Sequence, residues 1–78
     1  MLIEERGLKM KELNEIINAI QFLFESESGY KISKNSGVPY QTVQDLRNGK
    51  TKIEDARFRT IIKLYSYYAT LKELEMII

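Results

Sequence analysis

The sequence contains no cysteine, no histidine and no tryptophan, and only one proline and four glycines among its 78 residues. Without cysteine the chain forms no disulfide and no thiolate metal site, which suits a reducing cytoplasm. It also lacks the most common nucleophiles, general bases and zinc ligands. The remaining acid–base candidates are carboxylates and tyrosines, and their spacing indicates no convergent cluster. We therefore expect neither an enzyme nor a bound cofactor.

Long apolar runs are also missing. No segment approaches the roughly 18–20 apolar residues that a membrane span needs. Residues 1–3 are followed at once by Glu4 and Glu5, which argues against a signal peptide. With 44% hydrophobic and 29% charged residues, and without repeats or a linker, residues 1–78 are expected to form one globular cytoplasmic domain with no membrane partner.

The net charge of +1 hides an uneven distribution. Residues 30–63 carry eight Lys or Arg and three Asp or Glu, an excess of five positive charges. Residues 1–29 carry a net charge of −3 and residues 64–78 a net charge of −1. A surface that binds a polyanion would produce this asymmetry, and so would a chance excess of solvated side chains.

Apolar residues recur at spacings of three and four over residues 8–26, which predicts an amphipathic helix. Ser28 is a candidate N-cap for a short helix that Gly37 ends. A second short helix is predicted from Pro39 to Arg47. The Thr51–Glu54 spacing fits a capping box, so a longer helix is expected to start near residues 52–55, with its end or a bend near 69–70 left open. No segment alternates with period two, and we expect an all-α fold of four to five helices.

Residues 29–48 satisfy the steric demands of a helix-turn-helix, in which two helices cross at a steep angle. The fifth residue of the motif must be small, and it is Ser33; the ninth is best a glycine, and it is Gly37. Four further positions must be apolar because they join the helices to each other and to the core, and these positions hold Ile32, Val38, Val43 and Leu46.

At these residues the sequence resembles the phage-repressor-like and Cro-like helix-turn-helix domains, also called the XRE family. The matching stretch is residues 31–52, followed by Phe58, Ile61 and Tyr65, where the family has core residues of its fourth helix. With the preceding helix the resemblance covers about residues 10–68. It implies a compact DNA-binding domain from a bacterium or phage, although members of the family also include activators, antitoxins and protein-binding modules.

The resemblance implies that helix 39–47 enters the major groove, where its exposed residues contact base edges. The base-reading candidates are Tyr40, Gln41, Thr42 and Gln44. The candidates for phosphate contacts are Lys31, Lys34, Asn48, Lys50 and Lys52, and Arg57 or Arg59 can add to them. Two residues depart from the family pattern: Gly29 replaces a phosphate-clamping Gln, and Asp45 is expected to pair with Arg47, Lys50 or Lys52 or to accept from a cytosine.

The last predicted helix also carries an apolar stripe near the C-terminus. It is formed by Leu64, Tyr67, Leu71, Leu74 and Ile78. It lies on a different side of the helix from Phe58, Ile61 and Tyr65. One interpretation is a homodimer, with residues 69–78 as a dimerisation extension and two recognition helices about 34 Å apart on an inverted repeat. In the other interpretation the stripe completes the core of a monomer.

The favoured function is therefore sequence-specific binding of double-stranded DNA by a small transcriptional regulator, most simply a repressor that occupies an operator. The alternative is an antitoxin or adaptor whose main partner is a protein, such as a toxin or an anti-repressor. The acidic first helix and the apolar tail would then be the contact surfaces.

Overall fold

The computed structural model describes residues 10–77, with side-chain surroundings for residues 11–75. This part of the chain forms helices and no strand. The predicted all-α class is thus confirmed. The elements are α1 (Met10–Ser26), α2 (Gly29–Ser36), α3 (Tyr40–Arg47), the 3-10 helix η2 (Ile53–Asp55) and α4 (Phe58–Ile77).

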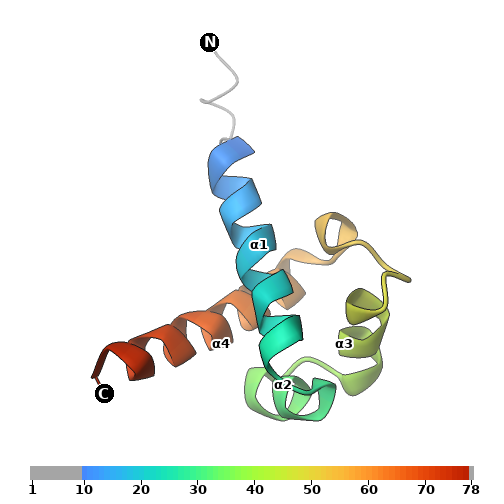
Figure 1. Cartoon of the computed structure of the whole chain (residues 1–78). Coiled ribbons are helices and arrows are strands. Elements are labelled where there is room, and N and C mark those ends of the chain that lie inside the picture. The colour runs from blue at the N-terminus through green and yellow to red at the C-terminus, as the bar shows by residue number, and fades with distance from the viewer. Residues whose placement is uncertain (1–9, 78) are drawn as a thin grey trace.

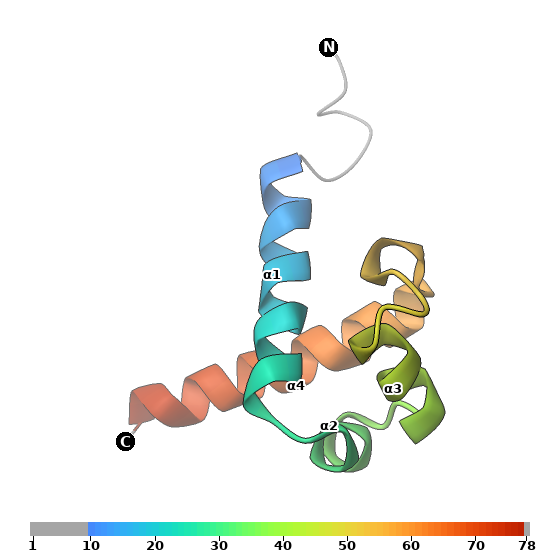
Figure 2. The same ribbon diagram turned by 45° about the vertical axis from the view of Figure 1, so that its right-hand side comes forward.

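The helices pack around one core. In Figures 1 and 2, α1 lies across α4, and α2 and α3 pack beside this crossing. All four α-helices, the α2–α3 turn and η2 contribute buried residues, each stabilising the fold by about 1.5–3 kcal/mol relative to an exposed side chain. These are Ile20, Leu23, Phe24, Ile32, Val38, Val43, Leu46, Ile53 and Leu64. Within residues 10–77, no helix is both long and apolar enough to cross a membrane.

The predicted boundaries of the first three helices are confirmed to within two residues. The hydroxyl oxygen of Ser28 accepts a hydrogen bond from the backbone N–H of Lys31 at 3.1 Å, so Ser28 is the N-cap of α2. Gly37 ends α2 at φ 83°, a left-handed conformation that only glycine adopts without strain. The chain then passes through Pro39 into α3.

The predicted start of the last helix is wrong. Residues 53–55 form only a single 3-10 turn, and its N-cap, Lys52, makes no side-chain capping bond. Ala56 is extended, at φ −72° and ψ 155°, and α4 begins at Phe58. The turn brings Ile53 into the core, where the residue is 7% exposed. Burial of this side chain therefore overrides the local capping signal of Thr51 and Glu54.

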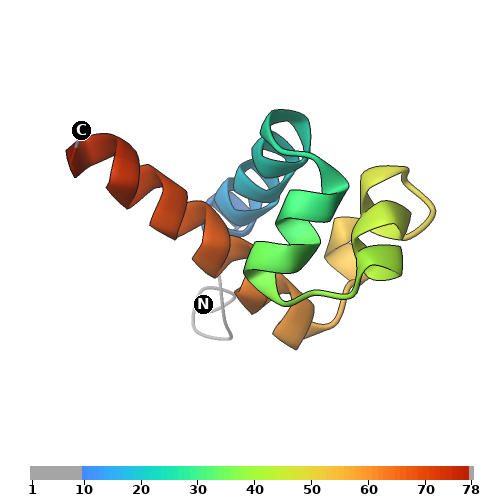
Figure 3. The same ribbon diagram turned by 90° about the horizontal axis from the view of Figure 1, so that it is seen from below.

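From Phe58, α4 continues to Ile77 without a break near residues 69–70. Its C-terminal half extends beyond the other helices (Figures 1 and 3).

The favoured assignment of the two apolar faces of α4 is wrong, and the other interpretation, in which the stripe completes the core, holds for Leu64, Tyr67 and Leu71. Leu64, expected at a partner surface, is fully buried within the chain. Tyr67 and Leu71 pack partly buried against the same core, Leu74 is exposed, and Ile78 lies outside the described residues. Phe58 and Tyr65, expected in the core, are exposed, whereas Ile61 packs partly buried against it. Both faces are apolar, so only the contacts that α1 and α2 make with α4 decide which one turns inward.

Candidate nucleic-acid interface

Two short helices, α2 and α3, pack against each other and are joined by residues 37–39 (Figure 3). Ile32 on α2 and Val43 on α3 are fully buried, and Val38 in the turn is 1% exposed. Ser33 is half-buried and donates its hydroxyl to the carbonyl oxygen of Val38 at 2.7 Å. The small residue and the apolar residues that the sequence pattern requires thus lie inside the pair, and the polar side of α3 faces outward.

The side chains in the first turn of α3 differ in their exposure to solvent. Tyr40 is 51% exposed, Gln41 is exposed and Thr42 is half-buried. The amide nitrogen of Gln41 donates to the carboxylate of Asp45 at 2.9 Å, one helical turn away. This bond fixes the direction of the Gln41 amide.

The expected pairing of Asp45 with a neighbouring cation is wrong. Among residues 10–77, the ion pairs are Lys31–Glu27 and Lys72–Glu75, and neither involves Asp45. Asp45 instead accepts from Gln41, because the i, i+4 spacing on α3 places the two side chains together.

Gln44, the fourth base-reading candidate, is half-buried. Its amide oxygen is buried and has no hydrogen-bond partner in the described part of the chain. The amide occupies the space beside Gly29 that a Cβ atom on that residue would fill, and the Arg47 guanidinium lies next to it. The departure from the family pattern at Gly29 therefore has a structural consequence: it makes room for Gln44.

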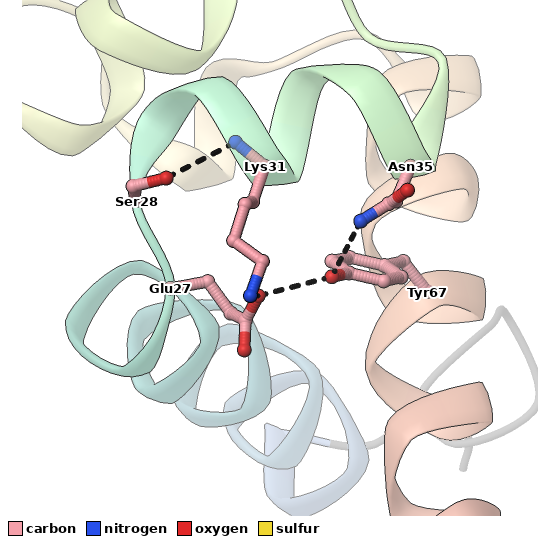
Figure 4. Close-up of polar contacts among 5 residues, drawn as sticks. All are labelled: Glu27, Ser28, Lys31, Asn35 and Tyr67. Carbon is pink, nitrogen blue, oxygen red and sulfur yellow. Dashed lines mark hydrogen bonds and ion pairs between the residues drawn. The ribbon is translucent and has the colours of Figure 1, made fainter.

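The predicted phosphate-binding residues fall into two groups. Asn48, Lys50 and Lys52 are all exposed, and they follow directly from the C-terminal end of α3. Lys31 and Lys34 lie on α2, where Lys31 is 3.8 Å from Glu27 and Lys34 is 6.0 Å from the centre of the Tyr30 ring. Figure 4 shows Lys31 beside Glu27 and Tyr67, close to both α1 and α4. An exposed pair of this kind contributes little, so it leaves the Lys31 charge available.

A groove of about 830 Å³ runs between α3 and the start of α4. Pro39, Thr42 and Asp45 line one side of it, and the other side carries three cations, Arg57, Arg59 and Lys63. The sequence predicts Arg57 and Arg59 only as additional phosphate contacts, and Lys63 is not among the predicted contacts. The recurrence of basic residues at 57, 59 and 63 just after the motif is the signal that identifies this side of the groove.

Six cations surround α3 without an ion pair to any described residue; they are Arg47, Lys50, Lys52, Arg57, Arg59 and Lys63. All six are exposed. Uncompensated positive charge on both sides of a polar helix attracts polyanions. In contrast, no group of three acidic, histidine or cysteine residues in the described part of the chain can hold a metal ion.

No protein-family model matches this chain, and comparisons with curated proteins and with solved structures also give no match.

Proposed function

We propose that the protein is a helix-turn-helix domain of the Cro-like type that binds double-stranded DNA with α3 in the major groove. One observation carries this proposal: the helix pair α2–α3 buries its constrained residues and leaves a polar helix face between cations that pair with no described residue. An α-helix fits the width of the major groove, and the flanking cations then lie against the phosphates.

In this arrangement the start of α3 reads the bases. Tyr40 and Thr42 offer a ring and a methyl group to thymine methyls, and Gln41 offers an amide to adenine. Asp45 holds the Gln41 amide at 2.9 Å in the free protein, so this amide is the one whose direction is set before DNA arrives. Asn48, Lys50 and Lys52 contact the backbone beyond the end of α3, and Arg57 and Lys63 contact it across the groove.

The biological role that follows is that of a small cytoplasmic regulator that occupies an operator and excludes other proteins from it, which is repression in its simplest form. A domain of this size covers a short half-site, so two copies on an inverted repeat give the specificity that one copy lacks. Phage and bacterial regulators use this arrangement.

Selection of bound duplexes from a random pool tests the proposal. We expect enrichment of one sequence, with half-sites about 10–10.5 base pairs apart if two copies bind. Lys50→Ala should reduce recovery of all sequences, whereas Lys11→Ala, an exposed change on α1, should not. A pool without enrichment at low salt would contradict DNA reading and would favour the protein-binding adaptor or antitoxin.

A further inference from the structure

The outer face of α4 is apolar and uncovered. Phe58, Ile62 and Tyr65 are 77%, 47% and 41% exposed. They lie on the side of the helix away from Leu64, which is fully buried in the core. Large apolar side chains grouped on one exposed helix face mark an association surface.

The outer face follows the heptad pattern of a coiled coil. Its positions are separated by four, three, four and three residues, and they hold Phe58, Ile62, Tyr65, Ala69 and Lys72. This spacing keeps one narrow seam directed at a single partner helix along α4. The inner face packs against α1 and α2. In the seam, Phe58, Ile62 and Tyr65 stay exposed, whereas Lys72 already lies over the Phe22 ring of α1.

The seam continues onto α1 through an aromatic cluster. Phe22, 48% exposed, meets Tyr68 edge-on with ring centres 6.1 Å apart, and the Tyr65 and Tyr68 rings are 5.8 Å apart. The Lys72 ammonium lies 4.9 Å from the centre of the Phe22 ring and 3.5 Å from Glu75. Its charge is therefore held at the edge of the seam. A single polar residue at such a position selects orientation and register.

We infer that α4 pairs with α4 of a second copy of this chain, antiparallel, along this seam. The charges favour a second copy because the two ends of α4 are complementary to each other. Arg59 lies near its start and Glu73 near its end, and neither forms an ion pair with a described residue. A two-fold axis across the helix brings each start against the other copy's end.

The heptad register gives the pairs across this axis. Residues whose numbers add to about 134 face each other, so Ile62 meets Lys72 and Tyr65 meets Ala69. Arg59 and Glu73 share the same flanking heptad position, and antiparallel helices bring such positions together. The dimer thus contains two Arg59–Glu73 pairs. A parallel arrangement forms neither pair, because it sets the two basic starts side by side.

This surface replaces the predicted dimerisation stripe. The inference does not rest on the proposed DNA binding: the dimer uses Arg59, whereas the proposed phosphate contacts across the groove use Arg57 and Lys63. The C-terminal end of α4 extends beyond the other helices (Figures 1 and 3).

Sedimentation of the intact chain over a range of concentrations, without DNA, tests the inference. We expect a reversible monomer–dimer equilibrium. Ile62→Lys should raise the dissociation constant at least about tenfold, because it faces Lys72 of the partner subunit. The matched control is Leu74→Lys, which changes a side chain of similar exposure, 51%, on the same helix but off the seam and should leave the constant unchanged. Circular dichroism verifies that both variants remain helical.

Charge reversal tests the orientation. Arg59→Glu should weaken the dimer, and Arg59→Glu combined with Glu73→Arg should restore it. A chain that stays monomeric at high concentration, or that associates only with a different protein, overturns the inference. If Ile62→Lys and Leu74→Lys have equal effects, the seam is not the dimer interface. If the double charge reversal does not restore the dimer, the two helices are not antiparallel. Absence of DNA selection alongside a dimer would refute only the proposed function.

Discussion

The amide of Gln44 on α3 packs against Gly29, the first residue of α2, and its buried oxygen has no partner among the described residues. A side chain on residue 29 would occupy the same space, so the two positions are coupled. A buried acceptor without a donor costs about 1–3 kcal/mol. This cost disfavours the packed position of Gln44, and in the proposed complex with DNA the side chain can turn outward to a base.

Gln44→Met should raise the stability of the free protein by about 1 kcal/mol, because methionine keeps the length of the side chain and removes the unpartnered oxygen. Urea denaturation followed by circular dichroism measures the change. The matched control is Gln41→Met, which loses an exposed hydrogen bond to Asp45 and should shift stability by no more than about 0.5 kcal/mol. A lower stability for Gln44→Met would show that the buried amide is satisfied after all.

Lys50→Ala and Gln41→Ala should affect DNA binding in different ways. In the proposed complex Lys50→Ala removes a phosphate contact, so it should weaken all sequences alike and reduce the slope of log affinity against log salt by about 1. Gln41→Ala removes a base contact, so it should cost about 1–3 kcal/mol at one base pair and relax the preference there. Titration of the selected duplex and its single-base variants at several salt concentrations measures both effects. An affinity independent of salt would contradict the cationic surface around α3.

Ser28→Ala should destabilise the protein by about 1 kcal/mol, because the Ser28 hydroxyl caps α2 at the Lys31 N–H. Thr51→Ala should cost less than about 0.5 kcal/mol, since Thr51 caps no helix and α4 begins only at Phe58. Thermal unfolding of the two variants compares the caps directly. Equal losses would mean that the capping box at residues 51–54 forms in solution.

The residues that begin and end α2 show which features of this fold are determined by local sequence. Ser28 and Gly37 act through their own backbone neighbours, so their roles follow from residue type and spacing. Thr51 and Glu54 have the same local spacing, but the burial of Ile53 determines the path of the chain there. Sequence patterns therefore predict the helices and fail where a distant contact outweighs a local one.

In the candidate site, too, some features follow from local sequence and others depend on distant contacts. The exposure of Tyr40 and Gln41 follows from the periodicity of α3, and the polar face could be predicted. The burial of the Gln44 amide depends on space beside Gly29, fifteen residues earlier, which no local pattern contains. The phase of α4 is a similar case, because its two apolar faces are alike in sequence and only packing against α1 and α2 distinguishes Leu64 from Tyr65.

Tyr67→Phe should destabilise the protein by about 1 kcal/mol, because the Tyr67 hydroxyl joins three helices. It donates to the Glu27 carboxylate at the end of α1 and accepts from the Asn35 amide on α2, both at 3.1 Å (Figure 4). The matched control is Tyr65→Phe, whose hydroxyl has no hydrogen bond to the described residues. Urea denaturation at a concentration where the chain is monomeric separates the two variants.

Substitutions at the same two positions also distinguish the two faces of α4. Tyr67 lies on the inner face, so Tyr67→Phe should leave the dimer dissociation constant unchanged in sedimentation while it lowers stability. Tyr65 lies on the outer seam, so Tyr65→Ala should weaken the dimer because it removes an aromatic ring from the contact. If Tyr67→Phe weakened association and left stability intact, the stripe of Tyr67, Leu71 and Leu74 would be the interface, and the packing of α4 against α1 and α2 would have to open to expose it.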